Sequence, residues 1–147
     1  LKSGQLDPAV YRNVVRHRAE MFAYNLLATA LSMDSLKHVC NIKWGDYARE
    51  EDRELIREAL RIQQVIKNTN FVEFFRILRR PSTNYFFSCL MLIHMHRMRL
   101  LAVEILTKSY QVTGTPLSLV KAKLNLPSEA DADELIKACG FFQERDP

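Results

Sequence analysis

The fold is decided by residues 115–143, which read TPLSLVKAKLNLPSEADADELIKACGFFQ. Thr115-Pro116 predicts the start of a helix, because the fixed backbone angle of proline suits the first helical position. Asn125-Leu126-Pro127 predicts a tight turn. We therefore expect a short helix that ends near Leu124 in an abrupt change of direction.

A second helix follows this turn. Ser128 and Asp131 resemble a capping box, in which the side chain of each residue pairs with the backbone N–H of the other. Gly140 predicts the end of this helix, and Phe141-Phe142-Gln143 predicts the first strand of a wing. Helix, turn, helix and strand is the order of a winged helix-turn-helix. We expect an all-α fold with this small β wing, which is incomplete because the sequence stops before a second wing strand.

Helical patterns fill the sequence upstream of this module. Apolar residues recur at helical spacing over about residues 7–31, 35–39, 50–67, 71–78 and 82–109. Asp7-Pro8 predicts the first helix start, and Asn68-Thr69-Asn70 predicts the turn of a helical hairpin. The last helix is apolar on nearly all sides through Met95, so we expect it to be central. The predicted organisation is a stack of helical hairpins over residues 1–110, continuous with a winged-helix module over residues 111–147.

The composition predicts one compact protein without a flexible linker. The chain has 147 residues, is 48% hydrophobic and contains only 4 Gly and 5 Pro. Cys40, Cys89 and Cys139 are odd in number and lie in apolar helical stretches, which predicts buried thiols in a reducing compartment. The apolar run from Tyr85 to Met95 is about half of the roughly 20 residues that a membrane-spanning helix needs, so we expect no membrane insertion.

The net charge of +4 is distributed unevenly along the chain. Residues 71–126 hold eight basic and two acidic side chains, whereas residues 127–147 hold six acidic and two basic ones. A basic middle region attracts phosphate chains, and an acidic end repels them. The alternative interpretation is that these charges only solvate helix faces.

The candidate nucleic-acid site consists of basic side chains from the middle region. In a winged helix, the second helix of the turn motif is usually the one inserted into a duplex groove. Here that helix carries acidic side chains, so we do not expect it to read a duplex. A sequence-independent RNA path requires only well-placed cations. The candidates are Arg79, Arg80, Lys108, Lys121 and Lys123.

The candidate protein interface lies near the end of the chain. Glu129 and Asp133 on the exposed face of the second helix could contact a basic partner. The strand at Phe141 and Phe142 would have an open edge that could accept a strand from another protein. The alternative is that the rest of the wing completes this edge outside the given sequence.

The sequence contains no catalytic motif that we recognise. It lacks a glycine-rich phosphate loop, a Gly-x-Ser-x-Gly elbow and a Cys-x-x-Cys pair. His94 and His96 point roughly 200° apart on a helix, whereas zinc ligands on one helix need a spacing of four residues. We expect one of these histidines in the core and the other near the surface. We expect a protein that is not an enzyme and that binds no metal or cofactor.

Several segments together resemble the SAC/GANP family of PCI-type proteins, over about residues 20–142. They are Glu20–Leu27, Ala59–Leu60, Asn70–Leu78, Ser88–Met91, Met98–Val103, Pro116–Ser118 and Cys139–Phe141. Their order along the chain, rather than any one of them, carries the resemblance. The family's helical region upstream of the first segment is absent here, and the wing is truncated.

The resemblance implies a PCI-type architecture, in which stacked helical repeats are capped by a winged helix. It implies side-by-side docking with a second PCI-domain protein, together with a small acidic DSS-type peptide. Such a complex exports messenger RNA from the nucleus at nuclear pores. The same architecture leaves an alternative, which is a subunit of a proteasome-lid, signalosome or translation-initiation complex without nucleic-acid binding.

Overall fold

The computed structural model describes residues 17–32, 34–109 and 116–140, which fold into helices without a strand. Their contacts divide the chain into two units, Leu1–Gln64 and Val65–Pro147. The all-α prediction is confirmed for the described residues. The expected helix start at Asp7-Pro8 and wing strand at Phe141-Phe142 lie outside them, as does the predicted boundary between residues 110 and 111. The division into a hairpin stack and a winged-helix module therefore stays a prediction.

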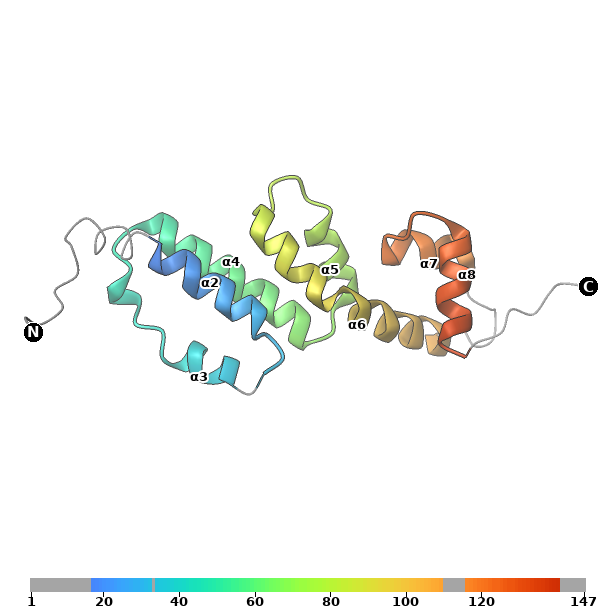
Figure 1. Cartoon of the computed structure of the whole chain (residues 1–147), viewed down its shortest axis with the longest axis horizontal. Coiled ribbons are helices and arrows are strands. Elements are labelled where there is room, and N and C mark those ends of the chain that lie inside the picture. Colours follow the sequence, from blue (N-terminus) through green and yellow to red (C-terminus); the bar gives the residue numbers. More distant parts are fainter. Residues whose placement is uncertain (1–16, 33, 110–115, 141–147) are drawn as a thin grey trace, which may run out of the picture. The chain divides into compact units, whose positions relative to one another are not determined.

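The first unit is built on α2 (Arg18–Ala28) and α4 (Glu50–Lys67), which lie side by side in Figure 1. Between them along the chain come α3 (Asp34–Cys40) and the short η1 turn (Trp44–Asp46). The buried Gln63 Nε2 donates a hydrogen bond of 3.3 Å to the Leu26 carbonyl, which joins α4 to α2. Fully buried apolar side chains of this unit include Ala23, Leu26, Leu27, Ile56, Ala59 and Ile62.

Tyr47 anchors the segment that follows η1. Its side chain is buried, and its carbonyl accepts a 2.7 Å hydrogen bond from Arg53 Nε of α4. Arg18 of α2 pairs with Asp46 at 2.9 Å and lies 5.7 Å from the centre of the Tyr47 ring. Burial raises the pKa of Tyr47, so its hydroxyl stays protonated at neutral pH.

The second unit contains α5 (Phe71–Leu78), α6 (Tyr85–Ser109), α7 (Leu117–Leu124) and α8 (Glu129–Ala138). α5 packs against α6 and α7, and α7 packs against α6 and α8. Phe74 and Phe75 of α5 are fully buried, and their rings meet edge to face with centroids 5.2 Å apart. Both rings lie in the core of the unit, so neither of these two side chains is exposed for stacking on a base.

The predicted helix-turn-helix is confirmed in α7 and α8. Asn125 adopts a left-handed backbone conformation with φ of 52°, which turns the chain after α7. Ser128 Oγ accepts a 3.1 Å hydrogen bond from the Asp131 N–H, and the Ser128 N–H donates to Asp131 Oδ2 at 3.0 Å. This capping box begins α8, and Gly140, with φ of 81°, lies just beyond its end.

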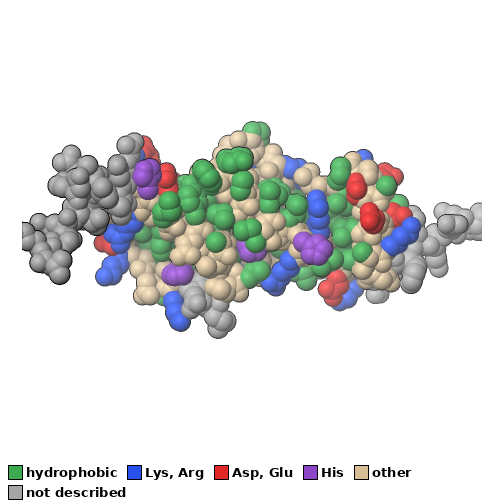
Figure 2. Space-filling view, viewed as in Figure 1, with side chains coloured by type: hydrophobic (Ala, Val, Ile, Leu, Met, Phe, Trp, Pro, Cys, Tyr) green, Lys and Arg blue, Asp and Glu red, His purple; other side chains and the backbone are tan. Residues whose placement is uncertain are grey.

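The prediction that α6 is central is only partly correct, because one of its faces is exposed. Phe87 and Met91 on one face are fully buried, but the opposite face is exposed from Tyr85 to Ile93. Figure 2 shows hydrophobic side chains, in green, gathered at the surface over this part of the second unit. The physical reason is that α5 and α7 together cover only one face of this helix.

The predicted burial of the cysteines also needs revision. Cys40 and Cys89 are exposed and Cys139 is half-buried, so the predicted burial of the thiols is wrong for the first two. Among the described helices, α6 reaches a mean hydropathy of 1.3 over a span-length window, so its length and composition would allow a membrane crossing. Only 33% of that window is buried, and α6 packs against α5 and α7 in the second unit.

Candidate functional site

Three of the candidate basic residues lie at the C-terminal end of α7. Lys121 and Lys123 lie in the last turn of this helix, on either side of Ala122. Arg79, at the end of α5, approaches the same turn, because its Nη1 lies 3.5 Å from the Ala122 carbonyl oxygen. Arg80 is the next residue and is exposed. The structure therefore places Arg79 beside the α7 turn that carries Lys121 and Lys123, and Arg80 follows Arg79 in the chain.

Two arginines supply partners for carbonyl groups at this end of α7. The last carbonyls of a helix have no partner within it, and cations are favoured beside them by the helix dipole. Arg79 donates to the Ala122 carbonyl and, through Nε, to the Phe75 carbonyl at 3.1 Å. Arg99 of α6 donates through Nη2 to the Asn125 carbonyl at 3.2 Å. These contacts tie α7 to both α5 and α6.

Arg99 makes a structural contact that sequence reasoning missed. In the sequence it was only one charge of the basic middle region, directly before the apolar run Leu100–Val103. A charged side chain in such a position usually has a polar partner, because burying it unpaired is costly. That signal indicates a structural contact, but not which carbonyl accepts the bond.

Lys108 differs from the other candidate cations. Its Nζ lies 2.6 Å from a carboxylate oxygen of Glu104, one turn earlier on α6, so its charge is balanced locally. Both side chains are exposed, and such pairs on a helix surface contribute only about 0.3–0.5 kcal/mol. Lys108 is therefore accessible, but no contact in the described part of the chain brings it to the end of α7.

The acidic candidates lie on α8, where Figure 2 shows red side chains at the surface. Glu129 is exposed at the start of the helix. Asp133 is half-buried and pairs with Lys137 at 2.6 Å. Phe141 and Phe142, the other half of the predicted interface, lie outside the described residues.

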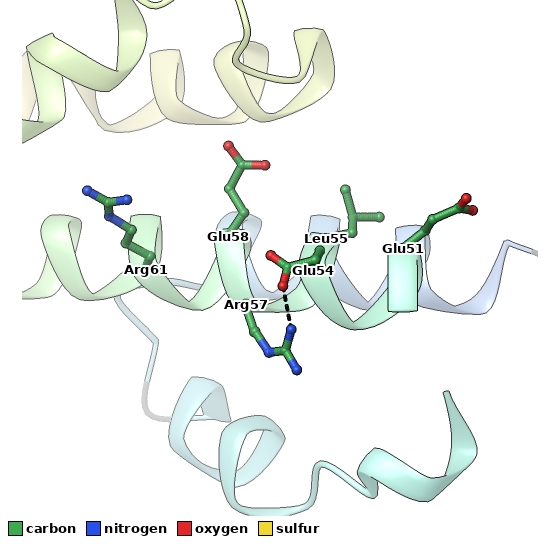
Figure 3. Close-up of a pocket in the computed structure, with 6 residues that line it drawn as sticks. All are labelled: Glu51, Glu54, Leu55, Arg57, Glu58 and Arg61. Carbon is green, nitrogen blue, oxygen red and sulfur yellow. Dashed lines mark hydrogen bonds and ion pairs between the residues drawn. The ribbon is translucent and has the colours of Figure 1, made fainter. Parts of the chain in front are cut away.

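A shallow hollow on α4 carries charged side chains but no convergent chemistry. Its lining residues all come from α4, as Figure 3 shows, and are Glu51, Glu54, Leu55, Arg57, Glu58 and Arg61. Arg57 hydrogen-bonds to Glu54 at 2.5 Å and to Glu50 at 2.7 Å, and the second bond lowers the pKa of Glu50. Arg57 and Glu54 pair with each other, and the lining side chains project from one helix rather than converging from several elements.

The described residues also include no group of three or more His, Cys, Asp or Glu side chains that could hold a metal ion. His94 is buried and His96 is exposed, which confirms the predicted division of this pair between core and surface. The chemistry that the second unit offers is therefore that of a charged and apolar surface.

The contacts of Arg99 predict its effect on stability. Arg99→Ala removes the hydrogen bond to Asn125 and should lower the free energy of unfolding by about 1.5–3 kcal/mol, the range for hydrogen bonds from charged groups. Arg97→Ala removes an exposed arginine two residues away and should change it by less than about 0.5 kcal/mol. Urea denaturation monitored by circular dichroism measures the free energy of unfolding of both variants. Equal effects of the two substitutions would show that the Asn125 contact contributes nothing.

Comparisons with known proteins identify the family of the chain. The model of the SAC3/GANP family matches residues 7–144, which confirms the resemblance found in the sequence. Protein xmas of Drosophila melanogaster is 29% identical over 92 residues, which cover 58% of this chain and 4% of that protein. The chain therefore spans a small part of the curated relative that it matches. No solved structure matches the chain.

Proposed function

Because the chain belongs to the SAC3/GANP family, we propose that it is a non-catalytic scaffold segment of a nuclear messenger-RNA export complex that acts at the nuclear pore. The family match over residues 7–144 is the observation that carries this proposal. It favours export over the alternative of a proteasome-lid, signalosome or translation-initiation subunit. The surfaces of the second unit are consistent with a scaffold, since they offer charge and apolar area rather than a reactive centre.

In this proposal the end of the chain binds a second PCI-domain protein, in a complex that also holds a small acidic DSS-type peptide. The exposed Glu129 at the start of α8 supports this assignment, because its carboxylate can pair with a basic side chain of the partner. Asp133 is already paired with Lys137 and would contribute less. Phe141 and Phe142 would extend the same interface beyond α8.

The basic residues at the end of α7 form the proposed RNA path. Arg79 keeps its positive charge while donating to carbonyl groups, and Arg80 and Lys123 are exposed beside it. Contacts from such cations to phosphates are independent of sequence and weaken with salt. The acidic side chains of α8 repel phosphate, so the path runs along α5 and α7. Lys108 would join it only if RNA displaced Glu104.

Capture of the chain from its own cells tests the scaffold proposal. Mass spectrometry after a moderate-salt wash should identify a second PCI-domain protein, a small acidic peptide and export factors. Glu129→Lys should reduce recovery of the PCI partner severalfold, because it places like charges at the proposed contact. Glu58→Lys makes the same charge change on α4 and should leave recovery unchanged. Recovery of proteasome-lid or signalosome subunits in place of export factors would overturn the proposal.

Charge reversal at the end of α7 tests the RNA path separately. In the assembled complex, Lys121→Glu combined with Lys123→Glu should weaken binding of single-stranded RNA at least about tenfold and flatten its salt dependence. Lys43→Glu reverses an exposed lysine of the first unit and should have little effect. Fluorescence anisotropy over a series of salt concentrations measures both. Unchanged affinity in the double variant would remove RNA from the proposed function and leave the scaffold role in place.

A further inference from the structure

The exposed face of α6 carries a set of large apolar side chains, which we name the α6 stripe and which the exposed His96 interrupts between Ile93 and Leu100. Its members are Tyr85 at 74%, Phe86 at 57%, Leu92 at 49%, Ile93 at 65% and Leu100 at 38% exposure. Cys89 is also exposed and lies between Phe86 and Leu92 along the helix. Most residues this apolar lie inside folded proteins, so their clustering on one helix face needs a physical reason.

The α6 stripe is one side of a two-sided helix. At 100° per residue, its members fall on the face opposite Phe87, Met91 and Met98, which are buried where α6 packs in the second unit. From Tyr85 to Leu100 the stripe is about 22 Å long at a rise of about 1.5 Å per residue. Its exposed area is on the order of 600 Å², the upper end of the largest apolar patch on a typical monomer. Patches of this size mark interaction sites.

The charges beside the stripe determine which partner fits it. α5 and α6 carry only two carboxylates, and both already have partners: Glu73 pairs with Arg76, and Glu104 with Lys108. Arg80 lies in the turn that leads into α6, and Arg97 lies one turn beyond Ile93. Both arginines are exposed, and neither pairs with a carboxylate within the described residues. A positive group thus stands near each end of the apolar face.

We propose that the α6 stripe is the docking site for an acidic amphipathic helix of a partner protein. A partner helix of about four turns would match the length of the stripe and could pack along α6 at a crossing angle of about 20°. Its apolar side chains, at spacings of three and four residues, would contact Tyr85, Leu92 and Ile93. Its flanking carboxylates would pair with Arg80 and Arg97. This site is distinct from the proposed interface on α8.

Charge complementarity favours this occupant over a second copy of the chain. Two copies of the stripe together would bury on the order of 1,200 Å², the lower limit for a stable protein interface. However, the described parts of α5 and α6 carry an excess of basic side chains, so pairing two such surfaces would place like charges together. An acidic helix gains the same apolar contact and also neutralises the arginines.

Selection from a displayed library tests the proposal on the whole chain. The library holds helical peptides of about 16 residues, long enough to cover the stripe, with randomised side chains. Panning should enrich peptides with apolar residues at helical spacing and a negative net charge. Ile93→Asp should weaken binding of the enriched peptides at least about tenfold, because it places a charge in the centre of the contact. Arg97→Glu should weaken the binding of acidic peptides and strengthen the binding of versions in which their acidic residues are replaced by basic ones.

Val72→Asp is the matched control. Val72 is an apolar residue of α5 outside the stripe with 49% exposure, so this substitution adds the same charge without touching the site. Absence of enrichment, enrichment of neutral or basic peptides, or equal binding to the Ile93→Asp variant would overturn the proposal. A dimer that Ile93→Asp abolishes, or binding to anionic lipid vesicles that it abolishes, would assign the face to a second copy or to a membrane instead. RNA affinity should be unchanged in all these variants, which separates this test from that of the RNA path.

Discussion

The arrangement of the second unit depends on carbonyl groups at the end of α7 that have no hydrogen-bond partner within this helix. An eight-residue helix is too short to be stable by itself and needs tertiary contacts. Its buried side chains Val120 and Leu124 supply the apolar contacts. Arg79 and Arg99 supply hydrogen bonds from two different helices. Because both arginines donate at the same end of α7, they fix where this helix lies relative to α5 and α6. The position of α8 follows, since the Asn125 turn and the Ser128 capping box connect it directly to α7.

Three surfaces of different chemistry result from this arrangement. Basic side chains gather where α5 meets α7, acidic side chains lie on α8, and α6 exposes an apolar face. A protein that organises others needs such separated contact areas, whereas a catalytic centre needs groups that converge. The chain belongs to the SAC3/GANP family, and we propose that these surfaces bind RNA, a PCI-domain partner and an acidic helix, with Arg80 shared between the first and the third.

Local signals in the sequence predicted the helices well. The bounds of α4 and α5 agree with the prediction, because an acidic first turn, the Asn68-Thr69-Asn70 turn and Pro81 are all close in sequence to the ends that they determine. The Ser128 and Asp131 capping box is another such case. The role of Arg99 could not be predicted in this way, because its acceptor lies 26 residues away in the sequence.

The exposed face of α6 shows a second limit of sequence reasoning. A helix that is apolar on nearly all sides has almost no amphipathic signal, so its sequence cannot indicate which face packs inside the molecule. Phe86 and Phe87 are adjacent and identical, yet one is exposed and the other is buried. Their difference arises only from where α5 and α7 lie. The same reasoning explains why Cys89 could be mistaken for a buried thiol.

Hydrogen exchange of the backbone amides in α7 and α8 tests the central claim most directly. If the two guanidinium groups hold α7 in place, then Arg79→Met combined with Arg99→Met should accelerate exchange throughout these two helices. Exchange in α2 and in the first three turns of α4, which belong to the other unit, should be unchanged. Unchanged protection of α7 in the double variant would contradict the account, as would equal acceleration in both units.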